Sequence, residues 1–304
     1  MPYIKVRDVS LHVNVVGRGE PLLLMHGGPG ADQWTLAGLR RCADQATLVF
    51  YDHRCNGRST GAEVSTMTWE NLTADAEALR EALGFERWSV LGHSFGGHVA
   101  LEYALRYPAS LSSLALVGTA AKSRWAREHA AEVLAARGWP PDTVDLCRRW
   151  FTGEVEPKDM FRTLMRLGPA YYHDPSLAIL VRGMLGGAWR TKLRPEALVL
   201  AGRHLANGWS VTDRLGEIRA PTLIAAGTSD FIFPPEAQAE LARGIPHARL
   251  ALIERAGHEP WVERPDAFFP VLRAFLATES RAPVPAASKW TDPQASVRCG
   301  SRRG

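Results

Sequence analysis

Residues 92–96 read Gly-His-Ser-Phe-Gly, between an apolar run at 88–91 and a helix-like stretch at 97–104. A serine between two glycines, with a strand before it and a helix after it, predicts a sharp strand-to-helix turn that exposes the serine at the end of a sheet. The glycines leave room for this turn, in which the serine backbone is strained. The pattern favours Ser94 as a nucleophile, although a glycine-rich turn with an uninvolved serine also fits the pentapeptide alone.

The composition is that of an ordinary globular protein. The chain has 304 residues, of which 46% are hydrophobic and 22% are charged, so it can bury one large core. Strand-like and helix-like patterns alternate along most of its length. This alternation predicts a single α/β domain, with a mostly parallel central sheet flanked by helices.

Segments that are continuously apolar, or that alternate in polarity, predict the strands of this sheet. They lie at residues 6–16, 21–25, 46–51, 88–91, 111–117, 221–227 and 249–253. A fully apolar run is typical of a strand that is buried on both faces of a parallel sheet. Apolar residues at helical spacing predict a helix over 68–83.

The alternation stops near the middle of the chain. Residues 119–212 carry helical patterns, with one strand-like run at 197–200. We therefore expect a helical cap over 119–212, inserted into a core formed by 1–118 and 213–277. Residues 278–304 include a stretch rich in Pro, Ala and Ser, and we expect this tail to be disordered.

Several function classes fit the sequence poorly. No apolar run approaches the roughly 18 residues of a membrane span, and the N-terminal residues lack the pattern of a secretory signal. The four cysteines stand apart, without the spacing of a metal site, and isolated thiols are typical of a cytoplasmic protein. The net charge of +4 comes mostly from the tail, where five Lys/Arg face two acidic residues. We expect no metal, no cofactor, and neither a nucleic-acid nor a membrane partner.

Two further polar residues follow predicted strands in the order that the serine turn requires. A serine hydroxyl becomes a nucleophile when a neighbouring base takes its proton, and a carboxylate orients that base. On this kind of turn the chain order is Ser, then Asp or Glu, then His. Asp230 follows the strand at 221–227, and His258 lies on a turn after the strand at 249–253. We predict a catalytic triad of Ser94, Asp230 and His258, against the alternative of a solvated aspartate and a surface histidine.

The loop at 26–30, His-Gly-Gly-Pro-Gly, directly follows the strand at 21–25. Acyl transfer needs backbone N–H groups that hold a developing oxyanion. We expect one from Phe95, the residue after the serine, and the other from Gly28, with Gly27 as second choice. The loop lacks the G-K-[ST] of a P-loop and the G-x-G-x-x-G spacing, which argues against a phosphate site.

Together these segments resemble the α/β-hydrolase superfamily and, within it, the proline iminopeptidase-like peptidases. The resemblance rests on the loop at 26–30, on Tyr-Asp-His-Arg-Cys-Asn-Gly-Arg-Ser at 51–59 and on the serine turn at 92–97. It covers residues 3–118 and 213–277. It implies a cofactor-free serine hydrolase that forms an acyl-enzyme and acts on a small molecule or a short peptide.

Two departures from that group leave the substrate open. Cys55 stands where the group usually has glycine, and Phe231 stands where some relatives carry an acid that reads an ammonium group. The cap segment 119–211 holds 14 Lys/Arg against 9 Asp/Glu, which is not an obvious ammonium trap. A carboxylesterase or lactonase for small apolar acyl groups, and a ligand receptor on a hydrolase scaffold, are the alternatives to an aminopeptidase.

Several side chains are candidates for substrate contact. In the core they are His26, Pro29, Phe231 and Trp261. Acids that could read an amine are Glu128, Glu132, Glu154, Glu156 and Glu259. Aromatic residues that could line an acyl pocket, or simply pack the cap, are Trp125, Trp139, Trp150, Phe151, Phe161, Tyr171, Tyr172, Trp189 and Trp209.

Overall fold

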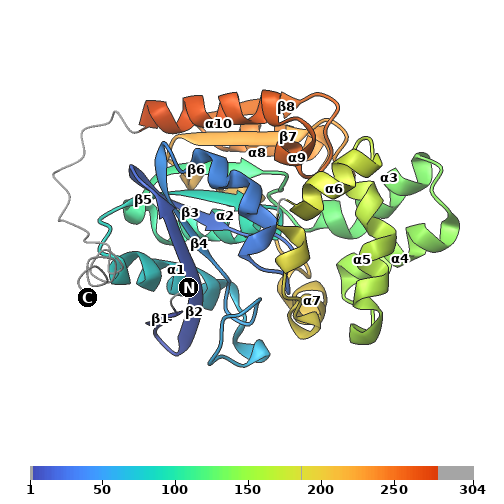
Figure 1. Ribbon diagram of the computed structural model, residues 1–304, viewed down its shortest axis with the longest axis horizontal. Coiled ribbons are helices and arrows are strands. Elements are labelled where there is room, and N and C mark those ends of the chain that lie inside the picture. The colour runs from blue at the N-terminus through green and yellow to red at the C-terminus, as the bar shows by residue number, and fades with distance from the viewer. Residues whose placement is uncertain (1–2, 186, 280–304) are drawn as a thin grey trace, which may run out of the picture.

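The computed structural model describes residues 3–185 and 187–279, which form an α/β structure around one sheet (Figure 1). Eight strands follow the order β1-β2-β4-β3-β5-β6-β7-β8. Strand β2 pairs antiparallel with β1 and β4, and all other neighbours are parallel, which confirms the mostly parallel sheet. The strands are β1 (Tyr3–Val6), β2 (Val9–Gly17), β3 (Glu20–Met25), β4 (Ala46–Tyr51), β5 (Trp88–His93), β6 (Leu111–Val117), β7 (Thr222–Gly227) and β8 (Ala248–Ile253).

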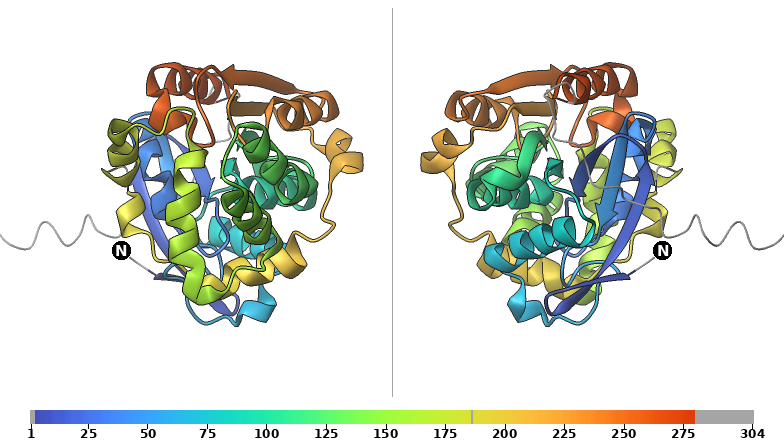
Figure 2. Two further views of the ribbon diagram at one scale, coloured as in Figure 1. Left: turned by 90° about the vertical axis from the view of Figure 1, so that its right-hand side faces the viewer. Right: turned by 90° about the vertical axis from the view of Figure 1, so that its left-hand side faces the viewer.

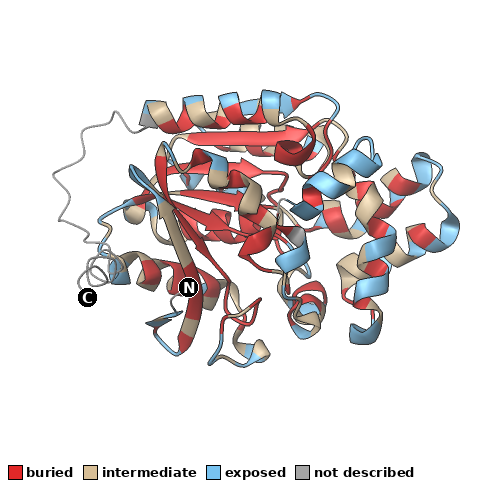
Figure 3. Cartoon of the chain, viewed as in Figure 1, coloured by how far each residue is buried: buried red, intermediate tan, exposed pale blue. Residues whose placement is uncertain are grey.

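Helices cover both faces of this sheet. Alternate residues of β3 enter two apolar clusters, with Leu23 and Met25 in one and Leu22 and Leu24 in the other. Burial on both faces explains why this strand is continuously apolar, and Figure 3 shows the strands largely buried. The first cluster includes residues of α1 (Trp69–Ala82), α2 (Phe95–Arg106) and α8 (Pro235–Gly244). The second includes residues of η1 (Gln33–Cys42), α9 (Pro260–Glu263) and α10 (Pro265–Glu279).

The helix predicted over 68–83 is confirmed as α1. Its N-cap is Thr68, whose side-chain oxygen accepts a hydrogen bond from the Asn71 N–H (3.2 Å). Such a cap satisfies one of the backbone donors that the first helical turn leaves free.

The strand predicted at 6–16 is confirmed as β2 from Val9 onward, but its start is wrong, because Val6 belongs to β1 and the two strands form a hairpin. Arg7 has a φ of 50°, and the chain turns there so that Val6 pairs with Val9. The Arg7 guanidinium donates to Asp75 of α1 (2.8 Å), which holds the turn against the helix. A two-residue turn leaves the polarity alternation intact on both sides, so the pattern carries no sign of the break.

Residues 119–212 form helices and turns at one end of the sheet, on the right of Figure 1 and toward the viewer in the left view of Figure 2. The strand-like run at 197–200 is wrong as a strand, because Pro195 starts a helix there. The α- and π-helical elements are η4 (Trp125–His129), α3 (Ala130–Ala136), α4 (Pro141–Thr152), α5 (Met160–Leu167), α6 (Leu177–Leu185), α7 (Pro195–Leu200) and η8 (Ala201–Leu205). Turns of 3-10 helix along the chain are η2 (Val64–Thr66), η3 (Pro108–Ser110), η5 (Pro157–Asp159), η6 (Gly168–Tyr171), η7 (Ala188–Arg190) and η9 (Thr212–Glu217).

The two ends of this helical segment run side by side. The Val211 N–H donates to the Ala121 carbonyl (2.8 Å), and the Ser123 N–H donates to the Trp209 carbonyl (3.0 Å). Between them lies an isolated antiparallel bridge from residue 122 to residue 210. Residues 121–123 and 209–211 therefore form a two-stranded neck between the cap helices and the sheet.

Three other expectations concern membrane spans, metal sites and the C-terminal tail. Among the helices of residues 3–185 and 187–279, none is both long and apolar enough to cross a bilayer. The same residues contain no group of three or more His, Cys, Asp or Glu that could hold a metal ion. From residue 280 onward, the tail expected to be disordered lies outside the described residues.

Candidate active site

Ser94 occupies the sharp turn between β5 and α2. Its φ of 55° and ψ of −122° lie outside the regions usual for a residue with a side chain. Gly96 makes the turn feasible, because a Cβ there would collide with the main-chain oxygen of Met25. The Ser94 N–H donates to Val117 of β6 (3.1 Å), and the Ser94 carbonyl accepts from the Thr119 hydroxyl (2.8 Å). These bonds fix the strained backbone and leave the serine half-buried.

Asp230 and His258 are joined directly, on the loops that follow β7 and β8. His258 Nδ1 donates to Asp230 Oδ2 over 2.7 Å, since an ionised carboxylate can only accept. Asp230 Oδ1 accepts the N–H groups of Ile232 (2.9 Å) and Phe233 (3.1 Å). Both side chains are buried. The Nε2 atom of His258 is therefore the ring nitrogen left to accept a proton.

Ser94 and the Asp230–His258 pair lie at the same edge of the sheet. A Cβ on Gly118, directly after β6, would lie 3.2 Å from Asp230 Oδ2 and 3.3 Å from His258 Nδ1. The residue before Gly118 is Val117, which holds the Ser94 backbone. Within the described residues no hydrogen bond joins Ser94 Oγ to His258. Catalytic hydrogen bonds are often long in a free enzyme and tighten when substrate is bound.

The loop at 26–30 packs against the serine turn. A Cβ on Gly27 would lie 2.8 Å from Ser94 Cβ, so a side chain there would force a shift. Gly28 has a φ of 63° and is exposed. Among the described residues, the N–H groups of Gly27, Gly28 and Phe95 donate to no main-chain acceptor. The N–H groups of all three predicted donors are therefore available to a ligand, and Gly27 and Phe95 lie next to Ser94.

His26 is fully buried and bonds to main-chain atoms only. Its Nδ1 donates to the Gly27 carbonyl (3.0 Å), and its Nε2 accepts the N–H of His53 (3.2 Å). Burial lowers the pKa of this imidazole, which favours the neutral ring that such bonding requires. His26 therefore anchors the loop at 26–30, and its contact with a substrate stays a prediction.

The other predicted contact residues lie in different surroundings. Pro29 is half-buried on the loop. Phe231 is fully buried, with its ring 5.5 Å from that of Tyr171 of the cap. Trp261 packs edge-on against His93 (4.7 Å) on the core side of the site. Neither large ring is exposed, so their contact with a substrate stays a prediction.

An aromatic cluster surrounds His98, one helical turn after Ser94. The His98 ring lies 4.3 Å from Trp209, 5.6 Å from Phe233 and 6.4 Å from Phe95. Neither ring nitrogen of His98 has a hydrogen-bond partner among the described residues. Burial lowers the pKa of His98 to about 3, so the imidazole is neutral at ordinary pH. This buried polar ring was not anticipated as part of the site.

Glu259 brings a carboxyl group next to the histidine. It is half-buried, and its Oε2 accepts a hydrogen bond from the Tyr172 hydroxyl (3.0 Å). Burial raises the pKa of this carboxyl group, with the Tyr172 hydrogen bond acting in the opposite direction. The candidate glutamates of the cap are all exposed, at positions 128, 132, 154 and 156.

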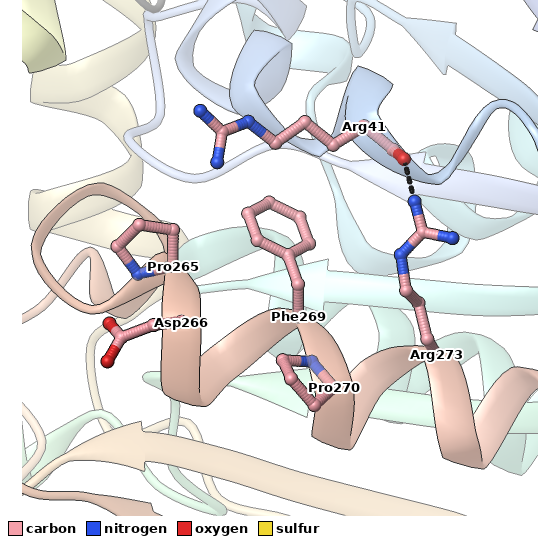
Figure 4. A pocket seen from close by; sticks show the side chains of 6 residues that line it. All are labelled: Arg41, Pro265, Asp266, Phe269, Pro270 and Arg273. Atoms are coloured by element: carbon pink, nitrogen blue, oxygen red, sulfur yellow. Dashed lines mark hydrogen bonds between the residues drawn. The ribbon is translucent and has the colours of Figure 1, made fainter.

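Two surface hollows lie elsewhere. Figure 4 shows one on α10, where Arg273 donates to the Arg41 carbonyl and to Asp44 (2.9 Å). It is lined by Arg41, Pro265, Asp266, Phe269, Pro270 and Arg273. The second lies between α7 and the loop that contains Cys55. Neither hollow includes a residue of the predicted triad, so neither is the candidate site.

Comparison with known proteins establishes the family of the fold. A family model described as the alpha/beta hydrolase fold matches residues 20–265. The chain belongs to the α/β hydrolase fold family. Its relatives are hydrolases, and they include the proline iminopeptidases that the sequence resembles.

The relatives of this α/β hydrolase differ in their substrates. The 2-hydroxy-6-oxo-6-phenylhexa-2,4-dienoate hydrolase of Comamonas testosteroni is 29% identical over 272 residues, 86% of this chain and 89% of the relative. The proline iminopeptidase of Lactiplantibacillus plantarum is 29% identical over 267 residues, 84% and 92% of the two chains. The solved proline iminopeptidase of Mycobacterium smegmatis superposes with a TM-score of 0.73 at 26% identity, over 92% of this chain and 98% of that one. The likeness establishes the family and leaves the substrate to be argued from the site.

Sequence reasoning missed several residues that shape the site of this hydrolase. Thr119 holds the Ser94 carbonyl, and Tyr171, which the sequence suggests only as an aromatic lining residue, accepts the His258 N–H on its main-chain carbonyl (2.7 Å). Glu263 accepts main-chain N–H groups beside His258. The contacts of Thr119 and Tyr171 join residues far apart in the chain, whereas Gly257 and Glu263 are six residues apart. No local motif marks any of them.

Proposed function

We propose that this α/β hydrolase is a serine hydrolase with Ser94 as nucleophile, His258 as general base and acid, and Asp230 as the group that orients His258. The observation that carries the proposal is the 2.7 Å bond between His258 Nδ1 and Asp230 Oδ2, at the sheet edge where Ser94 forms its strained turn. This bond keeps the proton on Nδ1 and leaves Nε2 free to take the serine proton.

The proposed reaction has two halves. Ser94 Oγ attacks a substrate carbonyl carbon while His258 Nε2 takes its proton, and the carbonyl oxygen becomes an oxyanion held by the N–H groups of Phe95 and of Gly28 or Gly27. The intermediate collapses to an acyl-enzyme as His258 returns the proton to the leaving group. Water, deprotonated by His258, then attacks the acyl carbon and releases the acid and free Ser94.

The substrate we propose is a small ester or amide, or a short peptide. No step of this reaction needs a cofactor. The buried thiols of Cys42, Cys55 and Cys147 are unpaired, which supports a place in a reducing compartment such as the cytoplasm.

A second, narrower candidate is an aminopeptidase of the proline iminopeptidase type. Such an enzyme must hold a charged amine, and an unpaired buried ammonium is costly. The four cap glutamates are exposed, whereas Glu259 is half-buried and directly follows His258. This position favours Glu259 as the acid that would read the amine.

Covalent labelling of Ser94 tests the main proposal. A fluorophosphonate should label the wild-type chain at Ser94, as found by mass spectrometry of the labelled peptide, and should not label Ser94→Ala. The same variant should lose several orders of magnitude in kcat for p-nitrophenyl esters. Activity above about a tenth of wild type, a loss of only about 1.4 kcal/mol, would overturn the assignment. Tight ligand binding without turnover would point instead to a receptor on a hydrolase scaffold.

A further inference from the structure

One buried carboxylate holds two separate segments of the main chain together beside His258. Glu263, at the end of α9, accepts the Gly257 N–H on Oε2 (2.6 Å). Its other oxygen, Oε1, accepts the N–H groups of His173 (2.8 Å) and Asp174 (3.2 Å). Among the described residues no Lys, Arg or His forms an ion pair with Glu263. Its carboxylate is therefore devoted to main-chain donors.

Both segments that Glu263 joins contact the main chain of His258, one by sequence and one by a hydrogen bond. Gly257 directly precedes His258, and residues 173–174 follow Tyr171, whose carbonyl accepts the His258 N–H (2.7 Å). The approach is close, since a Cβ on Gly257 would collide with that same Tyr171 carbonyl. Residues 171–174 belong to the cap segment, so the histidine loop is held against the cap through its main chain.

We infer that Glu263 is a positioning residue, which keeps His258 in its productive place and couples that place to the seating of the cap. This inference rests on the proposed function, because it assigns to His258 the role of base. A carboxylate that accepts three N–H groups defines the position of both segments. Displacement of a catalytic group by about 1 Å can cost about 100-fold in rate.

The glutamate-to-glutamine change separates this role from simple packing. Glutamine has nearly the same shape, but one of its two polar ends is an NH2 group that can only donate. In Glu263→Gln that end must face either Gly257 or the 173–174 segment, where it meets another donor. One of the two segments is then released while the side-chain volume is kept.

The matched control is Glu77→Gln on α1. Glu77 is also held by several donors, from Arg80, Tyr103 and Ser110, but it contacts no residue of the site. Both variants should lose some thermal stability, because each exchanges a well-bonded carboxylate for an amide. Only Glu263→Gln should change catalysis.

The experiment measures kcat and KM on a p-nitrophenyl ester, the rate of fluorophosphonate labelling, and the downfield proton resonance of the His258–Asp230 hydrogen bond. For Glu263→Gln we expect kcat and the labelling rate to fall at least about tenfold with KM within about twofold, and the downfield resonance to shift or broaden. Glu77→Gln should leave all of these at wild-type values. An unchanged kcat, labelling rate and resonance in a destabilised Glu263→Gln protein would reduce Glu263 to a structural residue and overturn the inference.

A second pair of variants covers the case in which Glu263→Gln does not fold. His173→Pro removes one of the three N–H donors, and the extended Tyr172 backbone before it (φ −113°, ψ 151°) suits a following proline. His173→Ala keeps that N–H. A fall in kcat with proline but not with alanine supports the coupling, and equal activity of the two variants contradicts it.

Failure of the proposed function would be seen separately. If the wild type is neither labelled nor active, the serine hydrolase proposal fails on its own. The His258–Asp230 resonance still reports whether Glu263→Gln displaces the histidine. An active wild type with an unaffected Glu263→Gln variant contradicts only the inference about Glu263.

Discussion

His258 is bonded to one oxygen of Asp230, while the other oxygen of that carboxylate is held by the main chain. Oδ2 lies 2.7 Å from His258 Nδ1, and Oδ1 accepts the N–H groups of Ile232 and Phe233. Two fixed donors thus determine how the carboxylate is turned. The orientation of the histidine is in this way tied to the backbone of the loop after β7.

Asp230→Asn should therefore be nearly inactive. The two N–H groups require an acceptor at Oδ1, which forces the new NH2 group toward His258 Nδ1. That nitrogen must then accept, the proton moves to Nε2, and the ring can no longer take a proton from Ser94. We expect a loss of about 10⁴-fold in kcat with little change in the unfolding midpoint. Steady-state kinetics together with urea unfolding check this, and activity within tenfold of wild type would contradict the assigned roles.

The buried ring of His98 predicts acid sensitivity of the fold. Its pKa is lowered from 6.5 to about 3 in the folded protein, so below pH 6.5 the unfolded chain binds a proton that the folded one does not. Stability is then lost as the pH falls from about 6.5 toward 3, by about 1.4 kcal/mol per pH unit for this group. His98→Leu should remove this part of the slope, as measured by urea unfolding between pH 6.5 and 5. A slope identical to wild type would rule out the contribution of His98.

At position 55 we expect glycine to give a more stable protein than alanine, the reverse of the usual order. It has a φ of 62°, a conformation that costs a residue with a side chain roughly 1–2 kcal/mol and costs glycine almost nothing. Although glycine is normally the less stabilising of the two, Cys55→Gly should be more stable than Cys55→Ala by about 1 kcal/mol. Equilibrium unfolding of the two variants is the measurement. The reverse order would mean that the loop relaxes out of this conformation.

Glu259 separates the two candidate substrate classes. If the enzyme reads a substrate amine, Glu259→Gln should raise KM for prolyl arylamides about tenfold or more, while p-nitrophenyl acetate cleavage stays almost unchanged. N-acylated proline substrates should be rejected by the wild type. The control is Glu86→Gln, which alters an exposed glutamate outside the cap. Good cleavage of uncharged esters with none of prolyl arylamides would limit the resemblance to the scaffold.

Much of the fold and of the candidate site could be predicted because the signals are local. The buried strands are continuous apolar runs, and the serine turn needs its glycines within five residues. Chain order and position after a strand predict Asp230 and His258, and the structure brings the two side chains into contact. For this contact, the residues at the strand ends were sufficient for a prediction from sequence.

The remainder depends on contacts between distant residues. The turn at Arg7 is held by Asp75 of α1, 68 residues later in the chain. The helix at 197–200 is a different case, because its signal, Pro195, is local and the strand-like run obscured it. No sequence signal near His26 predicts that both of its ring nitrogens bond to main-chain atoms. Tertiary packing decides such cases, and a single sequence does not display it.

The two-stranded neck has a consequence for how such a chain can change over evolutionary time. Ala121 and Val211 are hydrogen-bonded neighbours. The cap is therefore inserted into the chain as one loop whose two ends are held together at the neck. Closing a longer loop costs only about 0.6 kcal/mol for each doubling of its length. Recombination can therefore exchange or resize what lies beyond the neck without disturbing strand order. On the proposed function, the chemistry of the strand ends can then be inherited separately from whatever the cap contributes to substrate binding, provided that each new cap again supplies a segment to hold the histidine loop.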